Sequence, residues 1–332
     1  MIPAGSSNYQ LLKDEGFSVY TLPMREINRS PVNLILYFPA LFNNYFRVKK
    51  IVKKENCSYI LVNDFYNLLG AMMKIFGYRG KLITYVRLLP HTRPRILRNA
   101  WVRLAQRYSY QVIAVSDAVL QQLPSAKNTI RVYDPVIFRE KIVQQKPEDR
   151  HEIKLLYLSN YIQGKGQELA LEAFEGAYKK NTFLRLRFAG GDMELKKNKS
   201  FKLQLQTETE KRSLSQVIQF SDFAENIEKE IKAADIVLNF SEAESFSMTC
   251  AEASFYGRPV IATRSGGPEE IILHEKTGLL VKNRDVNEMT AAILLLASNK
   301  EKRIQYGIAG KKQVEEKFSI GKFSEAMNKI IQ

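Results

Sequence analysis

Two acidic residues, separated by seven others, frame a stretch of mostly small and apolar side chains. Glu244 and Glu252 enclose the sequence Ser-Phe-Ser-Met-Thr-Cys-Ala, and a Gly-Gly-Pro turn follows at 266–268. The run 235–241 before them has the apolar pattern of a strand, and the residues from Met248 onward have the pattern of a helix. A helix that begins with small residues offers unpaired N–H groups to an anion, so a phosphate could bind between these two carboxylates.

A lysine follows another predicted strand. Lys165 stands just after the apolar run 153–159. Ligands of open parallel sheets bind at the carboxyl ends of strands, which places this lysine near the loop that contains Glu244. Lysine can neutralise a diphosphate, while one carboxylate takes hexose hydroxyls and the other takes ribose hydroxyls. These residues therefore predict a site for a nucleotide-sugar.

Short apolar runs alternate with helical patterns along the whole chain. Strands are expected at 17–22, 58–63, 81–86, 110–115 and 130–133, and then at 153–159, 184–190, 217–222, 235–241, 258–263 and 277–282. Helices lie between them, and two or three more are expected after 286. The alternation predicts an α/β protein with two doubly wound, Rossmann-like parallel-sheet domains that face a cleft.

The chain has 332 residues, which favours two domains. The polar segment 140–152 is interpreted as a linker, giving domains at 1–147 and 148–332, and the last helix could return to the first domain. A doubly wound domain normally opens with a strand and a glycine-rich turn. Because this chain opens with loop-like residues, a first strand and helix of about 30 residues are expected to be missing from the first domain.

These features together resemble the group-one glycosyltransferases, a large retaining family with the GT-B fold. The family's E-x(7)-E motif matches Glu244 and Glu252. The runs 155–174 and 233–281 follow the family's pattern closely, whereas the match before 148 is looser. The resemblance implies an acceptor-side first domain and a second domain that binds the nucleotide-sugar.

The resemblance also implies a role for each site residue. Glu244 would contact the donor hexose near the reacting carbon as the catalytic residue, Glu252 would hold the ribose, and Lys165 would bind the diphosphate. The other donor-site residues implied are Asn160, Phe220, Ser245, Phe246, Ser247 and Met248. Many members carry Gly-Arg where this chain has Ser159-Asn160, and serines replace the glycines beside the loop phenylalanine.

No metal site is expected. The sequence has no Asp-x-Asp motif and no cluster of His, Cys and carboxylate residues at metal-ligand spacing. The expected reaction is metal-independent and uses no cofactor, because the UDP- or GDP-sugar donor is itself a substrate.

The net charge of +15 is concentrated in the first half of the chain. Residues 1–150 contain 23 Lys/Arg and 10 Asp/Glu, while the remainder contains 27 and 25. The stretch 34–55 is apolar on one face and basic near its end, and arginines surround Trp101. These two patches favour docking to an anionic membrane, although a core-facing helix with a solvated cationic end remains an alternative for 34–55. No nucleic-acid recognition motif occurs, so nucleic acid is a weaker partner.

The chain shows neither a signal-peptide pattern nor an uncharged apolar run of membrane-spanning length. It is therefore expected in the cytoplasm, where it could be peripheral at the inner face of the plasma membrane. The resemblance predicts a retaining hexosyltransferase that elongates a glycan or lipid-linked acceptor in surface polysaccharide biosynthesis. Three alternatives remain: a nucleotide-sugar epimerase, a glycan phosphorylase, or a truncated or degenerate non-catalytic protein that binds nucleotide-sugar.

Overall fold

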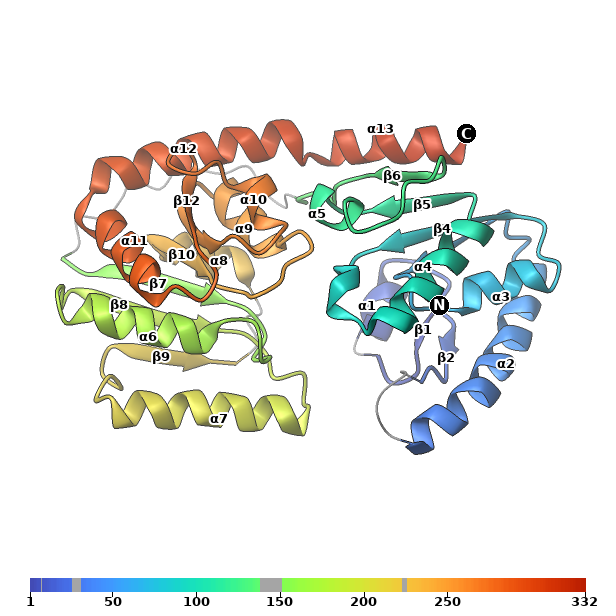
Figure 1. Ribbon diagram of the computed structural model, residues 1–332, viewed down its shortest axis with the longest axis horizontal. Helices are drawn as coiled ribbons and strands as arrows, with labels where there is room; N and C mark the ends of the chain where they lie inside the picture. Colours follow the sequence, from blue (N-terminus) through green and yellow to red (C-terminus); the bar gives the residue numbers. More distant parts are fainter. Residues whose placement is uncertain (7, 26–30, 138–150, 223–225) are drawn as a thin grey trace. The chain divides into compact units, whose positions relative to one another are not determined.

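The structure, a computed structural model, describes residues 1–6, 8–25, 31–137, 151–222 and 226–332, with the backbone only for 31–34. The chain divides into two compact units (Figure 1). Unit 1 consists of Met1–Ala114 and Leu123–Ile130, and unit 2 of Val115–Gln122 and Arg131–Gln332. The predicted boundary between 147 and 148 and nearly all of the predicted linker lie outside the described residues, so neither is tested.

Unit 1 contains a two-stranded and a four-stranded sheet. In the first, β1 (Ile2–Pro3) pairs in parallel with β2 (Thr21–Leu22). The second has the order β3-β4-β5-β6 and consists of β3 (Tyr59–Asn63), β4 (Lys81–Val86), β5 (Gln111–Ala114) and β6 (Thr129–Arg131). The helices are α1 (Asn8–Asp14), α2 (Pro31–Lys54), α3 (Leu69–Ile75), α4 (Arg95–Tyr108) and the short 3₁₀ helix η1 (Pro90–Thr92). Side chains from β2, α2, β3, α3 and β4 form one apolar core.

The expected strand at 17–22 is much shorter than predicted. Gly16 has a φ of 83°, and the Phe17 N–H donates to the Leu12 carbonyl at 3.0 Å. Residues 16 and 17 therefore close helix α1, and only Thr21–Leu22 pairs as a strand. The other strands predicted in the first half lie within about two residues of their expected bounds.

Trp101 does not belong to a surface patch. Its side chain is buried, and its ring makes edge contacts with Phe65 and Tyr66. The prediction that it contributes to a basic-aromatic docking surface is wrong, because α4 turns this aromatic residue inward while Arg95, Arg103 and Arg107 remain exposed.

Unit 2 is a six-stranded sheet of order β12-β11-β10-β7-β8-β9. The strands are β7 (Ile153–Leu158), β8 (Leu184–Ala189), β9 (Ile218–Ser221), β10 (Ile236–Asn239), β11 (Val260–Thr263) and β12 (Gly278–Val281). Every neighbouring pair runs parallel. The chain moves outward from β7 to β9 and then returns beside β7 with β10, so the strand order reverses there. This is the doubly wound topology expected from the sequence, and in sheets of this kind ligands bind where the strand order reverses.

Helices cover both faces of this sheet. The helices of unit 2 are α5 (Asp117–Leu120), α6 (Gln167–Tyr178), α7 (Lys196–Lys211), α8 (Ile227–Ala233), α9 (Met248–Phe255), α10 (Pro268–Ile271), α11 (Val286–Ser298), α12 (Lys300–Lys317) and α13 (Ile320–Ile331), and those in contact with the sheet include α6, α8, α9, α11 and α12. Helix α6 packs beside α11, and α9 packs beside α12 (Figure 1). Strands β7 and β10 are almost wholly buried between these layers, which makes their carboxyl ends a rigid base for loops.

Candidate functional site

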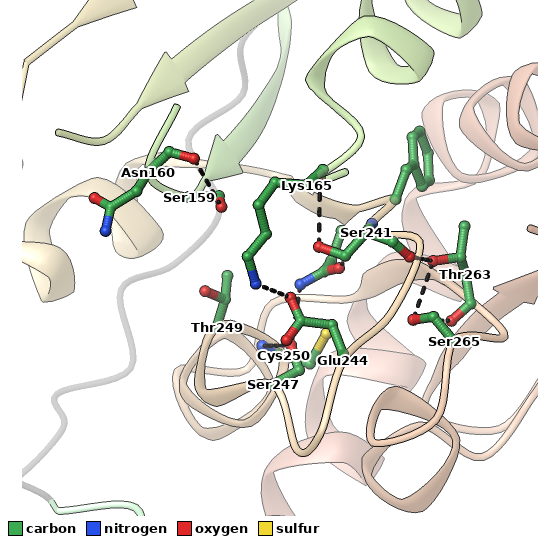
Figure 2. A network of polar contacts seen from close by, with 12 residues as sticks. Ser159, Asn160, Lys165, Ser241, Glu244, Ser247, Thr249, Cys250, Thr263 and Ser265 are labelled. Carbon is green, nitrogen blue, oxygen red and sulfur yellow. Dashed lines mark hydrogen bonds and ion pairs between the residues drawn. The ribbon is translucent and has the colours of Figure 1, made fainter. Parts of the chain in front are cut away.

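Lys165 and Glu244 meet at the point where the strand order of unit 2 reverses. Lys165 follows β7 and Glu244 follows β10, and these two strands are direct neighbours. The Lys165 Nζ lies 2.6 Å from the Glu244 Oε1 (Figure 2). Glu244 is mostly buried, whereas about a third of the Lys165 side chain is exposed. The pair thus places a partly exposed cation over a more deeply buried carboxylate at the carboxyl ends of two neighbouring strands, as the strand-end rule predicts.

The backbone of Glu244 is held by the loop that follows β11. Its N–H donates to the Ser265 carbonyl at 3.0 Å, and its carbonyl accepts from the Gly267 N–H at 2.8 Å. A Cβ at residue 267 would lie 2.3 Å from the Phe246 Cα, so only glycine permits this approach. The Gly-Gly turn seen in the sequence therefore has a structural role, because it allows the loop after β11 to pack closely against the loop that contains Glu244.

The loop of Lys165 is held in a similar way by β10. Gly166 has a φ of 79°, and a Cβ there would lie 2.0 Å from the Phe240 carbonyl oxygen. The buried Tyr157 hydroxyl donates to the Lys165 carbonyl and accepts from the Phe240 N–H. One side chain in β7 thus joins the loop after β7 to the loop after β10.

The start of α9 lies directly after Glu244. Ser247 has a φ of 78°, in the left-handed region, and its Oγ accepts hydrogen bonds from Asn239 Nδ2 at 3.0 Å and from the Cys250 N–H at 3.4 Å. Phe246 points into the protein and packs against Tyr133 and Phe318. These contacts anchor the loop on both sides of the turn.

Five consecutive amides at this turn have no acceptor in the described part of the chain. They belong to Ser245, Phe246, Ser247, Met248 and Thr249. Unpaired N–H groups at the beginning of a helix carry partial positive charge and bind phosphate oxygens. Together with Lys165 they provide a group of neighbouring donors of the kind that suits an anion.

Glu252 lies in the middle of α9. Its carboxylate makes no hydrogen bond or ion pair with the residues that the structure describes. Burial raises its pKa from 4.5 to about 7. A largely buried carboxylate without a protein partner can accept hydrogen bonds from a ligand's hydroxyl groups.

Two predicted residues are engaged in protein contacts. Asn160 Oδ1 accepts from the Gly191 N–H at 3.1 Å, so this side chain joins the ends of β7 and β8. The Phe220 ring stacks on Phe188 with 5.1 Å between centroids. The structure therefore brings Lys165 next to Glu244, while the roles predicted for Asn160 and Phe220 toward a ligand stay predictions.

Several supporting residues could not be found from the sequence. Tyr157 is one of many aromatic residues within strands, and Tyr133 lies far from the loop it supports. The position of Asn239 is a weak indication of its supporting role, because a buried side-chain amide at the end of an apolar strand needs a hydrogen-bond partner. Among the described residues, no group of three or more His, Cys, Asp and Glu side chains could hold a metal ion. None of the described helices has the length and hydropathy needed to cross a membrane.

A family model described as "Glycosyl transferases group 1" matches residues 138–313, which is more than half of the chain. The chain is 29% identical over 189 residues to alpha-1,3/1,6-mannosyltransferase ALG2 of Dictyostelium discoideum, which covers 53% of this chain and 45% of that protein. A trehalose synthase of Pyrococcus horikoshii is 36% identical over 94 residues, covering 28% of this chain and 22% of the synthase. The chain thus spans less than half the length of these two relatives.

Other similarities extend over nearly the whole chain. An uncharacterised glycosyltransferase of Methanocaldococcus jannaschii is 26% identical over 344 residues, covering 97% of this chain and 91% of its own length. The solved structure of Anabaena Alr3699/HepE in complex with UDP and glucose has a TM-score of 0.81 at 19% identity. It covers 97% of this chain and 88% of the Anabaena chain, which supports the fold for both units.

Proposed function

Because the chain belongs to the group 1 glycosyltransferases, which have the GT-B fold, we propose that it transfers a hexose from a nucleotide-diphosphate sugar. The observation that carries this proposal is the Lys165–Glu244 pair beside the five unpaired amides that begin at Ser245. This arrangement combines a cation and helix N–H groups for a diphosphate with a carboxylate for a sugar.

The diphosphate would bind between Lys165 and the start of α9. Departure of the nucleoside diphosphate leaves an additional negative charge on its terminal phosphate. A cation and preorganised amides stabilise that charge in the transition state without reorganising, which is the main source of catalysis in such a site. We propose that this charge compensation needs no metal ion.

The two glutamates would have separate tasks. Glu244 is held through its backbone and by Lys165, so it can position the hexose near the reacting carbon. Glu252 has no protein partner in the described part of the chain, so it can accept hydrogen bonds from the ribose hydroxyls. A donor that spans both carboxylates would be oriented by them.

We propose transfer with retention of configuration. The acceptor hydroxyl would approach the face from which the diphosphate leaves, and its proton would pass to the departing phosphate. The new glycosidic bond forms as the bond to the diphosphate breaks, so no covalent protein intermediate is needed. A UDP-sugar is the first donor to test, since the similar Anabaena protein was solved in complex with UDP and glucose, and a GDP-sugar is the second.

The proposed acceptor is a glycan or lipid-linked glycan of surface polysaccharide biosynthesis. We propose that the protein works in the cytoplasm at an anionic membrane surface that carries this acceptor. The excess of cations in residues 1–150 supports that placement.

The experiment that tests this function is donor turnover. The full chain is incubated with UDP- and GDP-hexoses and a lipid-linked glycan, and the anomeric configuration of the product is read by NMR. The proposal is supported if the unmodified chain forms product and the Lys165→Ala and Glu244→Ala variants do not. Nucleotide binding without turnover of any donor would favour the non-catalytic alternative, and an inverted product would contradict retention.

A further inference from the structure

Helix α2 exposes an apolar stripe on the side that faces away from its own core. Phe38, Phe42 and Phe46 have exposed fractions of 58%, 47% and 63%, and Ile35 is exposed more than any of them. Their spacing of three or four residues places them on one face of the helix. The neighbouring face of the helix, about a third of a turn away, buries Tyr37, Tyr45 and Val48. Helix α2 therefore has one apolar face in contact with the protein and a second in contact with solvent.

The end of α3 enlarges this surface. Ile75 and Phe76 are each about half exposed, and the Phe76 ring lies 6.3 Å from that of Phe42. The phenylalanine patch consists of Ile35, Phe38, Phe42, Phe46, Ile75 and Phe76. Contiguous patches of exposed apolar side chains mark interaction sites, whereas apolar residues scattered singly over a surface do not.

The same helical face continues as a basic surface. Lys49 and Lys53 follow Phe46 at the same spacing, and both are exposed. Arg47, Lys50 and Lys54 lie beside them. Residues 31–54 contain no Asp or Glu. One face of α2 is thus aromatic in its first half and cationic in its second half.

We propose that this face of α2, with the end of α3, docks on an anionic bilayer. The inference rests on the proposed transfer to a lipid-linked acceptor and identifies the surface that meets the lipid. The phenylalanine patch enters the boundary between headgroups and acyl chains, and the lysines contact lipid phosphates. From Ile35 to Phe46 the helix measures about 16 Å, which is too short to span a bilayer but suits a helix lying in its plane.

The charges favour a bilayer over a second copy of the chain. A second copy joined through the phenylalanine patch would offer no carboxylate from its own α2 to the five cations of this helix, among which Lys54 has an acidic neighbour, Glu55, at 3.5 Å. An anionic lipid surface offers both the apolar layer and the negative charge.

The test is co-sedimentation of the full chain with vesicles of phosphatidylcholine, alone or mixed with phosphatidylglycerol, at low and high salt. We expect binding to the mixed vesicles that weakens with salt. Lys49→Ala/Lys53→Ala should weaken it about fivefold per lysine. Phe42→Ser/Phe46→Ser should weaken it about tenfold or more.

Matched controls lie in unit 2. Lys196→Ala/Lys197→Ala removes two exposed lysines of α7, and Phe183→Ser removes another exposed phenylalanine. Both controls should bind vesicles as the unmodified chain does. Control variants that lose binding as strongly as the α2 variants would overturn the proposal, and so would equal binding to neutral vesicles.

Two further measurements separate this surface from the proposed function. Phe42→Ser/Phe46→Ser should bind UDP as tightly as the unmodified chain, since the donor residues belong to unit 2. If the phenylalanine variant binds vesicles as tightly as the unmodified chain and donor turnover is retained, the proposed docking surface is contradicted and the proposed transferase activity is not. If vesicle binding follows expectation but no donor is turned over, the transferase fails. If the unmodified chain does not bind vesicles but forms a dimer in light scattering, and Phe42→Ser/Phe46→Ser abolishes that dimer, the patch serves self-association instead.

Discussion

Among single residues, Glu252 is expected to make the proposed donor site sensitive to pH. Burial raises its folded pKa from 4.5 to about 7. Because the folded pKa exceeds the unfolded one, the contribution of Glu252 to the free energy of unfolding is full below about pH 4 and is lost as pH rises through about 7. Glu252→Gln should therefore lose less stability than the unmodified chain between about pH 5 and pH 8. Denaturant unfolding at both pH values checks this, and an equal loss in the two proteins would contradict it.

The same carboxylate should govern nucleotide affinity. Ribose hydroxyls donate best to the ionised form, so we expect UDP to bind more tightly as pH rises through about 7. Glu252→Ala should weaken binding by about 1.5–3 kcal/mol and remove this pH dependence, as measured by calorimetry. Glu244→Ala should keep the affinity for UDP and lose transfer. Equal losses of UDP affinity in both variants would show that the two glutamates do not divide the tasks as proposed.

Ser247 combines an unfavourable backbone conformation with two hydrogen bonds. Its φ of 78° costs about 1 kcal/mol in a residue other than glycine. Its hydroxyl accepts from Asn239 and caps α9. Ser247→Ala should lower the free energy of unfolding by about 1–3 kcal/mol, because it keeps the strained conformation and loses both bonds. Ser247→Gly should lose less, because it relieves the strain. Thermal unfolding of the two variants tests this expectation. A lower free energy of unfolding for Ser247→Gly than for Ser247→Ala would refute it.

At the scale of elements, two loops of unit 2 depend on contact through Gly267. A methyl group at this position would overlap the Phe246 backbone, and relieving the overlap requires one of the two loops to move away from the other. Gly267→Ala should therefore lower UDP affinity as well as stability. The matched control is Gly310→Ala in α12, where a Cβ would meet its nearest atoms at an ordinary 3.4 Å and helix propensity would favour alanine. Unchanged UDP binding in Gly267→Ala would show that this contact does not support the site.

The strand pattern predicted the elements on which the candidate site residues lie. Strands β7 and β10 were recognisable from short apolar runs, and the strand-end rule correctly brought Lys165 next to Glu244. Local patterns failed where distant contacts decide the structure. Trp101 is buried because Phe65 and Tyr66 cover it, and the clamp between Glu244 and Gly267 joins loops from different strands. Neither partner can be identified from residues close in sequence.

For the whole molecule, the two separate cores predict how the chain unfolds. Unit 1 and unit 2 each have their own cluster of buried apolar residues. The proposed donor site belongs to unit 2 alone. UDP at a hundred times its Kd should therefore stabilise one calorimetric transition by about 2.7 kcal/mol and leave the other in place. Lys165→Ala should reduce this shift. A single transition that moves as a whole would show that the two units unfold cooperatively.

The hydroxyl of Tyr157 has a consequence for the precision of the site. It bonds the Lys165 carbonyl on one side and the Phe240 N–H on the other, so the two loops that carry the cation and the carboxylate share one fixed reference atom. We therefore expect displacements of the two loops to be coupled through this hydroxyl. Tyr157→Phe, which keeps the ring and removes both hydrogen bonds, should loosen the spacing between the cation and the carboxylate.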